Sequence, residues 1–237
     1  MFRTSVPRFS SGFTLVELAI VILIIGLLLG GLLTPLSAQI ELRRLSETQK
    51  TLQEIRDALV GFAVTNGHLP CPDYDTDPAA AGYGVEDSSC NAPTVEGFLP
   101  WKTLGVADVD AWGARRSAAA SPRLGDWRYR VDRNYVTTTS FRTSAFLTSA
   151  AAFQDNLQVN DRAGNQLTTD NERAIAVVYS AGKDATPNLE NGIFNSTYAS
   201  DVLDNLDPTS STHYDDVLIW LSRPFIINRM VAAGRLP

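Results

Sequence analysis

One uninterrupted apolar segment near the N-terminus constrains the fold of this chain more than any other feature. Residues 18–38 form a run of 21 residues without a charge, mostly Leu, Ile, Val and Gly. As a helix that rises about 1.5 Å per residue, the run covers about 30 Å, which is the thickness of the hydrocarbon core of a bilayer. The segment therefore predicts a membrane-spanning helix.

Three interpretations of this segment compete: a secretory signal peptide, a plain membrane anchor, and an anchor that is cut ahead of the apolar run. A signal peptide needs a small residue three positions before its cleavage site, and a cut after Ala38 would place Leu36 there. Glu17 stands at the front of the run, where an ionisable residue is costly and marks a functional site. The first two interpretations give this residue no role.

The residues around Glu17 resemble a known motif. The segment Ser11-Gly12-Phe13-Thr14-Leu15-Val16-Glu17-Leu18 and the apolar residues after it are similar to the prepilin cleavage and methylation motif of type IV pilins and type II secretion pseudopilins. The resemblance implies that a membrane-embedded prepilin peptidase cuts after Gly12 and methylates the new amine on Phe13. It also implies that Glu17 pairs with the N-terminal amine of a neighbouring subunit, which would offset the cost of a carboxylate in hydrocarbon.

The remaining helical pattern completes the expected domain organisation. Apolar residues recur at helical spacing and form one stripe: Leu42, Leu45, Leu52, Ile55, Leu59 and Phe62. Asn66-Gly67, followed by Pro70 and Pro72, ends the helix. We expect a leader at 1–12, a transmembrane and assembly helix at 13–38, its amphipathic continuation at 39–66 and a periplasmic globular domain at 67–237. The predicted fold class is α+β, a pilin-like lollipop whose long N-terminal helix packs on a small antiparallel sheet.

The globular part contains three predicted strands, at 127–131, 174–180 and 217–221. Arg128 and Arg130 alternate with apolar residues, so we expect their face of the strand to lie in water. Asp110-Ala111-Trp112-Gly113 resembles the pseudopilin turn that leads into the first strand of the sheet. We also expect a short helix near 144–153, and a C-terminal helix that follows Ser222 as its N-cap.

The two cysteines, Cys71 and Cys90, close a loop of about 20 residues. In an exported domain a disulfide between them is plausible, and it would contribute about 3 kcal/mol to stability. Two reduced, buried thiols are the alternative.

The acidic loop after the second predicted strand is the best ligand candidate. Residues 180–184, 188–192 and 214–217 resemble the calcium loop of the major pseudopilin of type II secretion, and Asp184, Asp215 and Asp216 would be its first ligands. The chain has about 20 additional residues in this loop, and Tyr214 stands where the family has an Asp. Carboxylates in such loops also form turns and cap strands, and we favour this interpretation over calcium.

Composition and motifs exclude several other functions. With 20 Lys and Arg against 26 Asp and Glu, the net charge of −6 makes direct binding of nucleic acid unexpected. The sequence contains no zinc motif, P-loop, dinucleotide fingerprint or Gly-x-Ser-x-Gly, so we expect no enzyme.

We therefore predict a minor pilin or pseudopilin. It would be a single-pass protein of the bacterial inner membrane with its C-terminal domain in the periplasm, and it would join a periplasmic or extracellular filament. Its partners would be prepilin peptidase and other pilin or pseudopilin subunits. Two alternatives remain: a calcium-dependent binding or adhesion module on a pilin anchor, and a secreted soluble enzyme if the N-terminus is an ordinary signal peptide.

Overall fold

The computed structural model describes residues 12–88, 96–113, 126–136, 141, 155–169, 172–192, 195–201, 210 and 213–236, apart from the side chains of 28–36 and 38. The chain divides into two compact units, Met1–Arg43 and Arg44–Pro237. The predicted helix at 144–153 lies outside the described residues.

Helix α1 runs from Leu15 to Asn66. It ends where the sequence predicts: Gly67 adopts a left-handed conformation with φ of 79°, and its N–H donates to the Ala63 carbonyl at 2.8 Å. Within the described part of the chain, we find no helix with the length and apolar character that crossing a membrane requires. The predicted membrane-spanning half is therefore not confirmed.

The second unit contains a four-stranded antiparallel sheet in the order β1-β2-β4-β6. Its strands are β1 (Gly97–Phe98), β2 (Arg128–Val131), β4 (Ala174–Ser180) and β6 (Val217–Ser222). The three predicted strands are confirmed as β2, β4 and β6. The strand at 127–131 is not the first of the sheet, because β1 precedes it in the chain and pairs with it.

A parallel pair of short strands, β3 (Gln158–Asn160) and β5 (Thr197–Ala199), lies apart from this sheet. The remaining elements are the short helix α2 (Trp101–Leu104), the 3₁₀ turn η1 (Arg133–Tyr135) and the C-terminal helix α4 (Arg223–Ala232). Helix α4 follows β6 directly. Ser222 occupies its N-cap position, as predicted, although the side chain makes no capping hydrogen bond.

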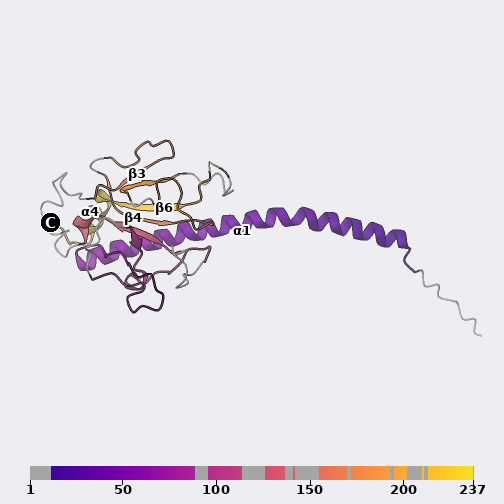
Figure 1. Ribbon diagram of the computed structural model, residues 1–237, viewed down its shortest axis with the longest axis horizontal. Helices are drawn as coiled ribbons and strands as arrows, with labels where there is room; N and C mark the ends of the chain where they lie inside the picture. The colour runs from indigo at the N-terminus through magenta and orange to yellow at the C-terminus, as the bar shows by residue number, and fades with distance from the viewer. Residues whose placement is uncertain are drawn as a thin grey trace, which may run out of the picture. The chain divides into compact units, whose positions relative to one another are not determined.

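The sheet separates two hydrophobic cores. Figure 1 shows β4 and β6 between the C-terminal part of α1 and β3. On one face, Leu52, Ile55 and Leu59 of α1 are fully buried against Tyr129 and Val178. On the other face, residues of β4 and β6 pack against residues in and next to the β3–β5 pair. The centre of this core consists of Val177, Tyr179, Leu157, Val159 and Tyr198, and Leu218 and Trp220 lie at its edge.

The predicted apolar stripe of the helix is correct only in part. Its central residues form the core, but Leu42 is 65% exposed. Leu42 belongs to the unit that ends at Arg43, whereas the buried members of the stripe belong to the unit that begins at Arg44. Helical spacing marks a face, and a neighbouring element decides whether that face is covered.

Candidate functional site

The predicted processing site lies directly before α1. Gly12 and Phe13 are exposed and not helical, and Phe13 is 88% exposed. The helix begins two residues later, at Leu15. The bond between Gly12 and Phe13 therefore lies outside regular secondary structure, just before a helix, where a peptidase could reach it.

Thr14 and Glu17 close the first turn of α1 as a capping box. The Glu17 N–H donates to Thr14 Oγ1 at 3.2 Å, and the Thr14 N–H donates to Glu17 Oε2 at 3.0 Å. The Thr14 hydroxyl also donates to Oε2, at 2.9 Å. We did not predict this capping box from the sequence, although Thr-x-x-Glu before an apolar run is its ordinary signature.

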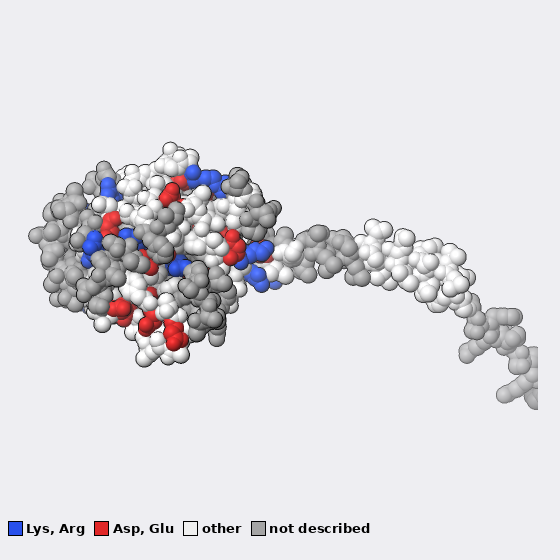
Figure 2. All heavy atoms as spheres, viewed as in Figure 1, with Lys and Arg blue, Asp and Glu red and all other residues white. Residues whose placement is uncertain are grey.

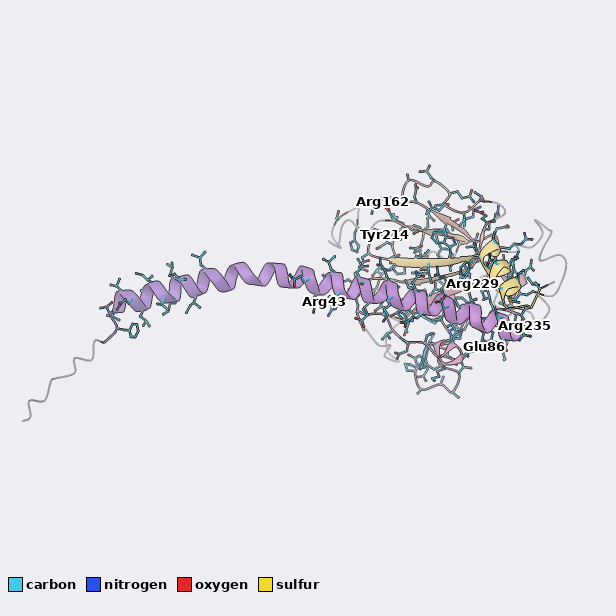
Figure 3. All side chains as sticks on the ribbon, turned by 180° about the vertical axis from the view of Figure 1, so that it is seen from behind. Arg43, Glu86, Arg162, Tyr214, Arg229 and Arg235 are labelled. Carbon is cyan, nitrogen blue, oxygen red and sulfur yellow. The ribbon has the colours of Figure 1, made fainter. Side chains whose placement is uncertain are left out.

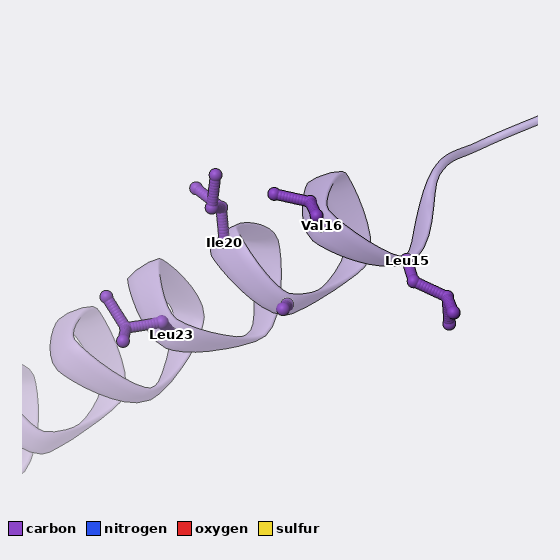
Figure 4. A pocket seen from close by; sticks show the side chains of 5 residues that line it. Leu15, Val16, Ile20 and Leu23 are labelled. Atoms are coloured by element: carbon purple, nitrogen blue, oxygen red, sulfur yellow. The ribbon is translucent and has the colours of Figure 1, made fainter.

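The first turns of α1 expose apolar side chains on every side. Leu15, Val16, Ala19, Ile20 and Leu23 line a shallow apolar hollow on the helix surface. In Figure 4, Val16, Ile20 and Leu23 project from the same side of the helix. Val16 is 68% exposed and Leu23 is 65% exposed, so this surface is available to lipid or to another apolar helix.

In the second unit, two of the predicted metal ligands meet at an unpredicted third residue. His213 Nε2 lies 3.1 Å from Asp184 Oδ2 and 3.3 Å from Asp215 Oδ1. Asp184 lies in the turn after β4, whereas His213 and Asp215 lie just before β6. Burial, and then the negative charge of Asp184, raise the pKa of Asp215. Sequence reasoning gave His213 no role, because 29 positions separate it from Asp184.

The third predicted ligand, Asp216, is held differently. Its Oδ2 accepts hydrogen bonds from the Asn188 N–H and from Asn191 Nδ2, both at 2.8 Å. Burial raises the pKa of Asp216 well above its ordinary value. These bonds fit the turn-forming role that we favour from the sequence, and calcium at this loop stays a prediction.

The turn after β4 is held in place by a close approach to Asp215 and by hydrogen bonds of Ser180. Gly182 has φ of 65°, and a Cβ there would lie 2.4 Å from Asp215 Cγ, so the close approach requires glycine. Ser180 Oγ accepts from the Gly182 N–H at 3.1 Å and donates to Asp110 Oδ2 at 2.5 Å. Asp110 Oδ1 in turn accepts from the Trp112 N–H at 3.0 Å, so the predicted Asp-x-Trp-Gly turn is joined to the end of β4.

Tyr214 anchors the segment that contains His213 and Asp215. Its hydroxyl donates to the Ala199 carbonyl of β5 at 2.8 Å. The guanidinium carbon of Arg162 lies 6.0 Å from the centre of its ring, and Figure 3 shows the two residues as neighbours. Arg162 also forms an ion pair with Asp201, with Nε 2.7 Å from Oδ2.

The expectation that Arg128 and Arg130 face water is wrong. They are only 7% and 5% exposed, because the β3–β5 layer covers their face of the sheet. Arg128 Nη1 lies 3.9 Å from Glu96 Oε1, and Arg130 Nη1 donates to the Asn195 carbonyl. Elsewhere the described Lys, Arg, Asp and Glu side chains are interspersed on the visible surface of the second unit (Figure 2).

Glu96, the partner of Arg128, was also missed by the sequence analysis. Tyr179 donates to its Oε1 at 2.8 Å, and Tyr198 donates to its Oε2 at 3.2 Å. Burial raises the pKa of Glu96, while the charge of Arg128 and the two hydroxyl donors oppose that rise. The network joins β2, β4 and β5.

Of the predicted disulfide partners, Cys71 is buried at 9% exposure, and Cys90 lies outside the described residues. The pairing stays a prediction.

Comparison with known protein families gives a match near the N-terminus. Residues 7–33 match the family model of the prokaryotic N-terminal methylation motif. Comparison of the chain with curated proteins and with solved structures gave no match. The motif match supports a type IV pilin-like or pseudopilin-like protein, processed by prepilin peptidase and assembled with other pilin subunits.

Proposed function

We propose that this chain is a minor pilin or pseudopilin, a structural subunit of a type IV pilus or of a type II secretion pseudopilus. The observation that carries the proposal is the register between motif and helix. The matched motif spans residues 7–33, and within it the exposed Gly12-Phe13 pair precedes the helix by two residues. A cut after Gly12 would leave a mature chain that is helical almost from its first residue.

In this proposal, residues 13–38 hold the subunit in the inner membrane, and residues 67–237 lie in the periplasm. The exposed apolar residues of α1 are the surface that would contact lipid before assembly and neighbouring helices afterwards. The motif also favours a structural over an enzymatic role, since an independently acting periplasmic enzyme has no use for it.

In this proposal, Glu17 sets the axial register between neighbouring subunits during assembly. In the free subunit its carboxylate is bonded to Thr14 of its own chain. After processing, the methylated amine of Phe13 on a neighbouring subunit would offer a full positive charge to the same carboxylate. In an apolar environment each of these two charges is costly unless it contacts the other. The pairing would therefore select the one axial register that brings the two groups together.

The test of processing is the intact mass and N-terminal sequence of the chain, produced with and without an active prepilin peptidase. We expect a chain that begins at Phe13 and carries one added methyl group only when the peptidase is active. Gly12→Val should leave the chain uncleaved. Gly61→Ala is the control: it changes a glycine of α1 whose Cβ would contact nothing within 4 Å, and it should be processed normally. A start after Ala38 would overturn the proposal and favour a secreted soluble protein.

Glu17→Ala separates processing from assembly in the same host. We expect cleavage to continue, while co-purification with other filament subunits is lost. Unchanged assembly of this variant would contradict the proposed pairing of Glu17 with the Phe13 amine.

A further inference from the structure

Two carboxylates and one imidazole converge where the turn after β4 meets the segment that precedes β6. One oxygen or nitrogen atom from each of Asp184, His213 and Asp215 lies within 4.8 Å of the other two. We propose that these three residues bind a divalent transition-metal ion, of which Zn²⁺ is the best match. The site lies wholly within the unit Arg44–Pro237, so it is independent of processing at Gly12.

The backbone orients both carboxylates toward His213. Asp215 Oδ2 accepts hydrogen bonds from the N–H groups of Lys183 at 2.7 Å and Asp184 at 3.2 Å, which leaves Oδ1 facing the imidazole. Asp184 Oδ1 accepts from the Thr186 N–H at 2.7 Å, and its Oδ2 faces the same nitrogen. In metal sites, outer bonds of this kind fix the direction of each ligand.

Among the described residues, the converging atoms of Asp184 and Asp215 have too few hydrogen-bond donors. Asp215 is 1% exposed, and among the described residues its Oδ1 accepts no hydrogen bond, although it faces His213 Nε2. A single Nε2–H carries one proton and cannot serve two carboxylate oxygens at full strength, and a bare Nε2 would repel both. A bound cation would satisfy all three atoms at once, which is why we assign a ligand here and not a turn alone.

The donor set selects the class of metal. Calcium and magnesium prefer oxygen, whereas imidazole together with carboxylate suits Zn²⁺ and its neighbours. With bonds of about 2.1 Å, adjacent ligands of such an ion lie about 3.0 to 3.4 Å apart, and the separations of 3.1 and 3.3 Å fall in this range. The Asp184 side chain is 22% exposed, so water can complete the coordination. The ion would tie the turn after β4 to the segment before β6.

The experiment uses the full-length chain, purified in a mild detergent and stripped with chelator. Titration calorimetry with Zn²⁺ and metal analysis after dialysis should give one Zn²⁺ per chain. His213→Gln and Asp184→Asn should each weaken binding by at least about 10-fold. Asparagine can still accept the Thr186 N–H, so Asp184→Asn should remove the ligand and keep the turn. Circular dichroism without metal checks that both variants fold.

Matched controls lie elsewhere in the chain. His68→Gln changes the other histidine, and Asp77→Asn changes an aspartate whose Oδ1 likewise accepts a local backbone N–H, that of Ala79 at 2.9 Å. Both should bind Zn²⁺ as the parent does. The proposal is overturned if no Zn²⁺ binds, or if His213→Gln binds it as the parent does. Tight calcium binding that His213→Gln leaves unchanged would also overturn it, and would favour an oxygen-only site.

Discussion

Glu96 is enclosed by side chains from three strands, and its ionisation is linked to folding. Burial raises the pKa of Glu96 above its ordinary 4.5, despite Arg128 and the two tyrosine hydroxyls. The folded chain therefore keeps this proton at pH values where the unfolded chain has released it. The free energy of unfolding that Glu96 contributes is complete below pH 4.5 and declines as the pH rises above that value.

Glu96→Gln tests this linkage. We expect the variant to lose the part of the decline that Glu96 causes, about 1.4 kcal/mol for each unit by which the pKa is raised. The measurement is urea unfolding of the full-length chain in detergent, followed by tryptophan fluorescence from pH 4 to pH 8. Glu54→Gln, which removes an exposed carboxylate paired with Lys50, is the control and should keep the slope of the parent. A Glu96→Gln slope equal to that of the parent would contradict the linkage.

At the scale of single elements, α1 illustrates how one helix can have two environments. Ile55 is fully buried against the sheet, whereas Leu42 is 65% exposed on the same predicted stripe. Ile55→Ala should therefore lower the free energy of unfolding by about 2 to 5 kcal/mol, because it leaves a cavity in the core. Leu42→Ala should change it by less than about 0.5 kcal/mol.

Both α1 variants can be measured by the same urea unfolding experiment. Equal destabilisation by Ile55→Ala and Leu42→Ala would show that the stripe is covered along its whole length. That result would be inconsistent with the division of the chain at Arg43 and Arg44.

At the scale of the whole molecule, the predicted cross-link between Cys71 and Cys90 is directly testable. Alkylation of the full-length chain followed by intact mass should modify no cysteine until reductant is added, and two afterwards. Replacing both cysteines by serine should lower the free energy of unfolding by about 3 kcal/mol, in keeping with a closed loop of about 20 residues. Two alkylated cysteines without reductant would show that the bond is absent.

Local sequence signals predicted much of the fold. The end of α1 at Asn66 follows from Gly67 and the two prolines, and β2, β4 and β6 follow from short apolar runs between breaking residues. Each of these signals lies within a few residues of the element that it defines. Local signals do not predict whether a charged face of a strand is buried. Arg128 is buried because β3 and β5, which lie far along the chain, cover it.

The residues of the candidate sites also differ in how far the sequence predicts them. Gly12, Phe13 and Glu17 stand within one contiguous motif, residues 7–33, so the sequence alone is enough to predict their roles. His213 and Asp184 are brought together only by the antiparallel pairing of β4 and β6. The resemblance to a calcium loop predicted Asp184 and Asp215, two of the three converging residues, and no local pattern indicated the histidine.

The continuity of α1 has a mechanical consequence. The helix runs without a break from Leu15 to Asn66, and its last turns hold Leu52, Ile55 and Leu59 in the core of the second unit. A force applied along the axis of these last turns would load the three contacts together, in shear, rather than break them one at a time. If the chain is anchored at its N-terminus, the hydrophobic contacts that stabilise the folded domain also resist its separation from the helix.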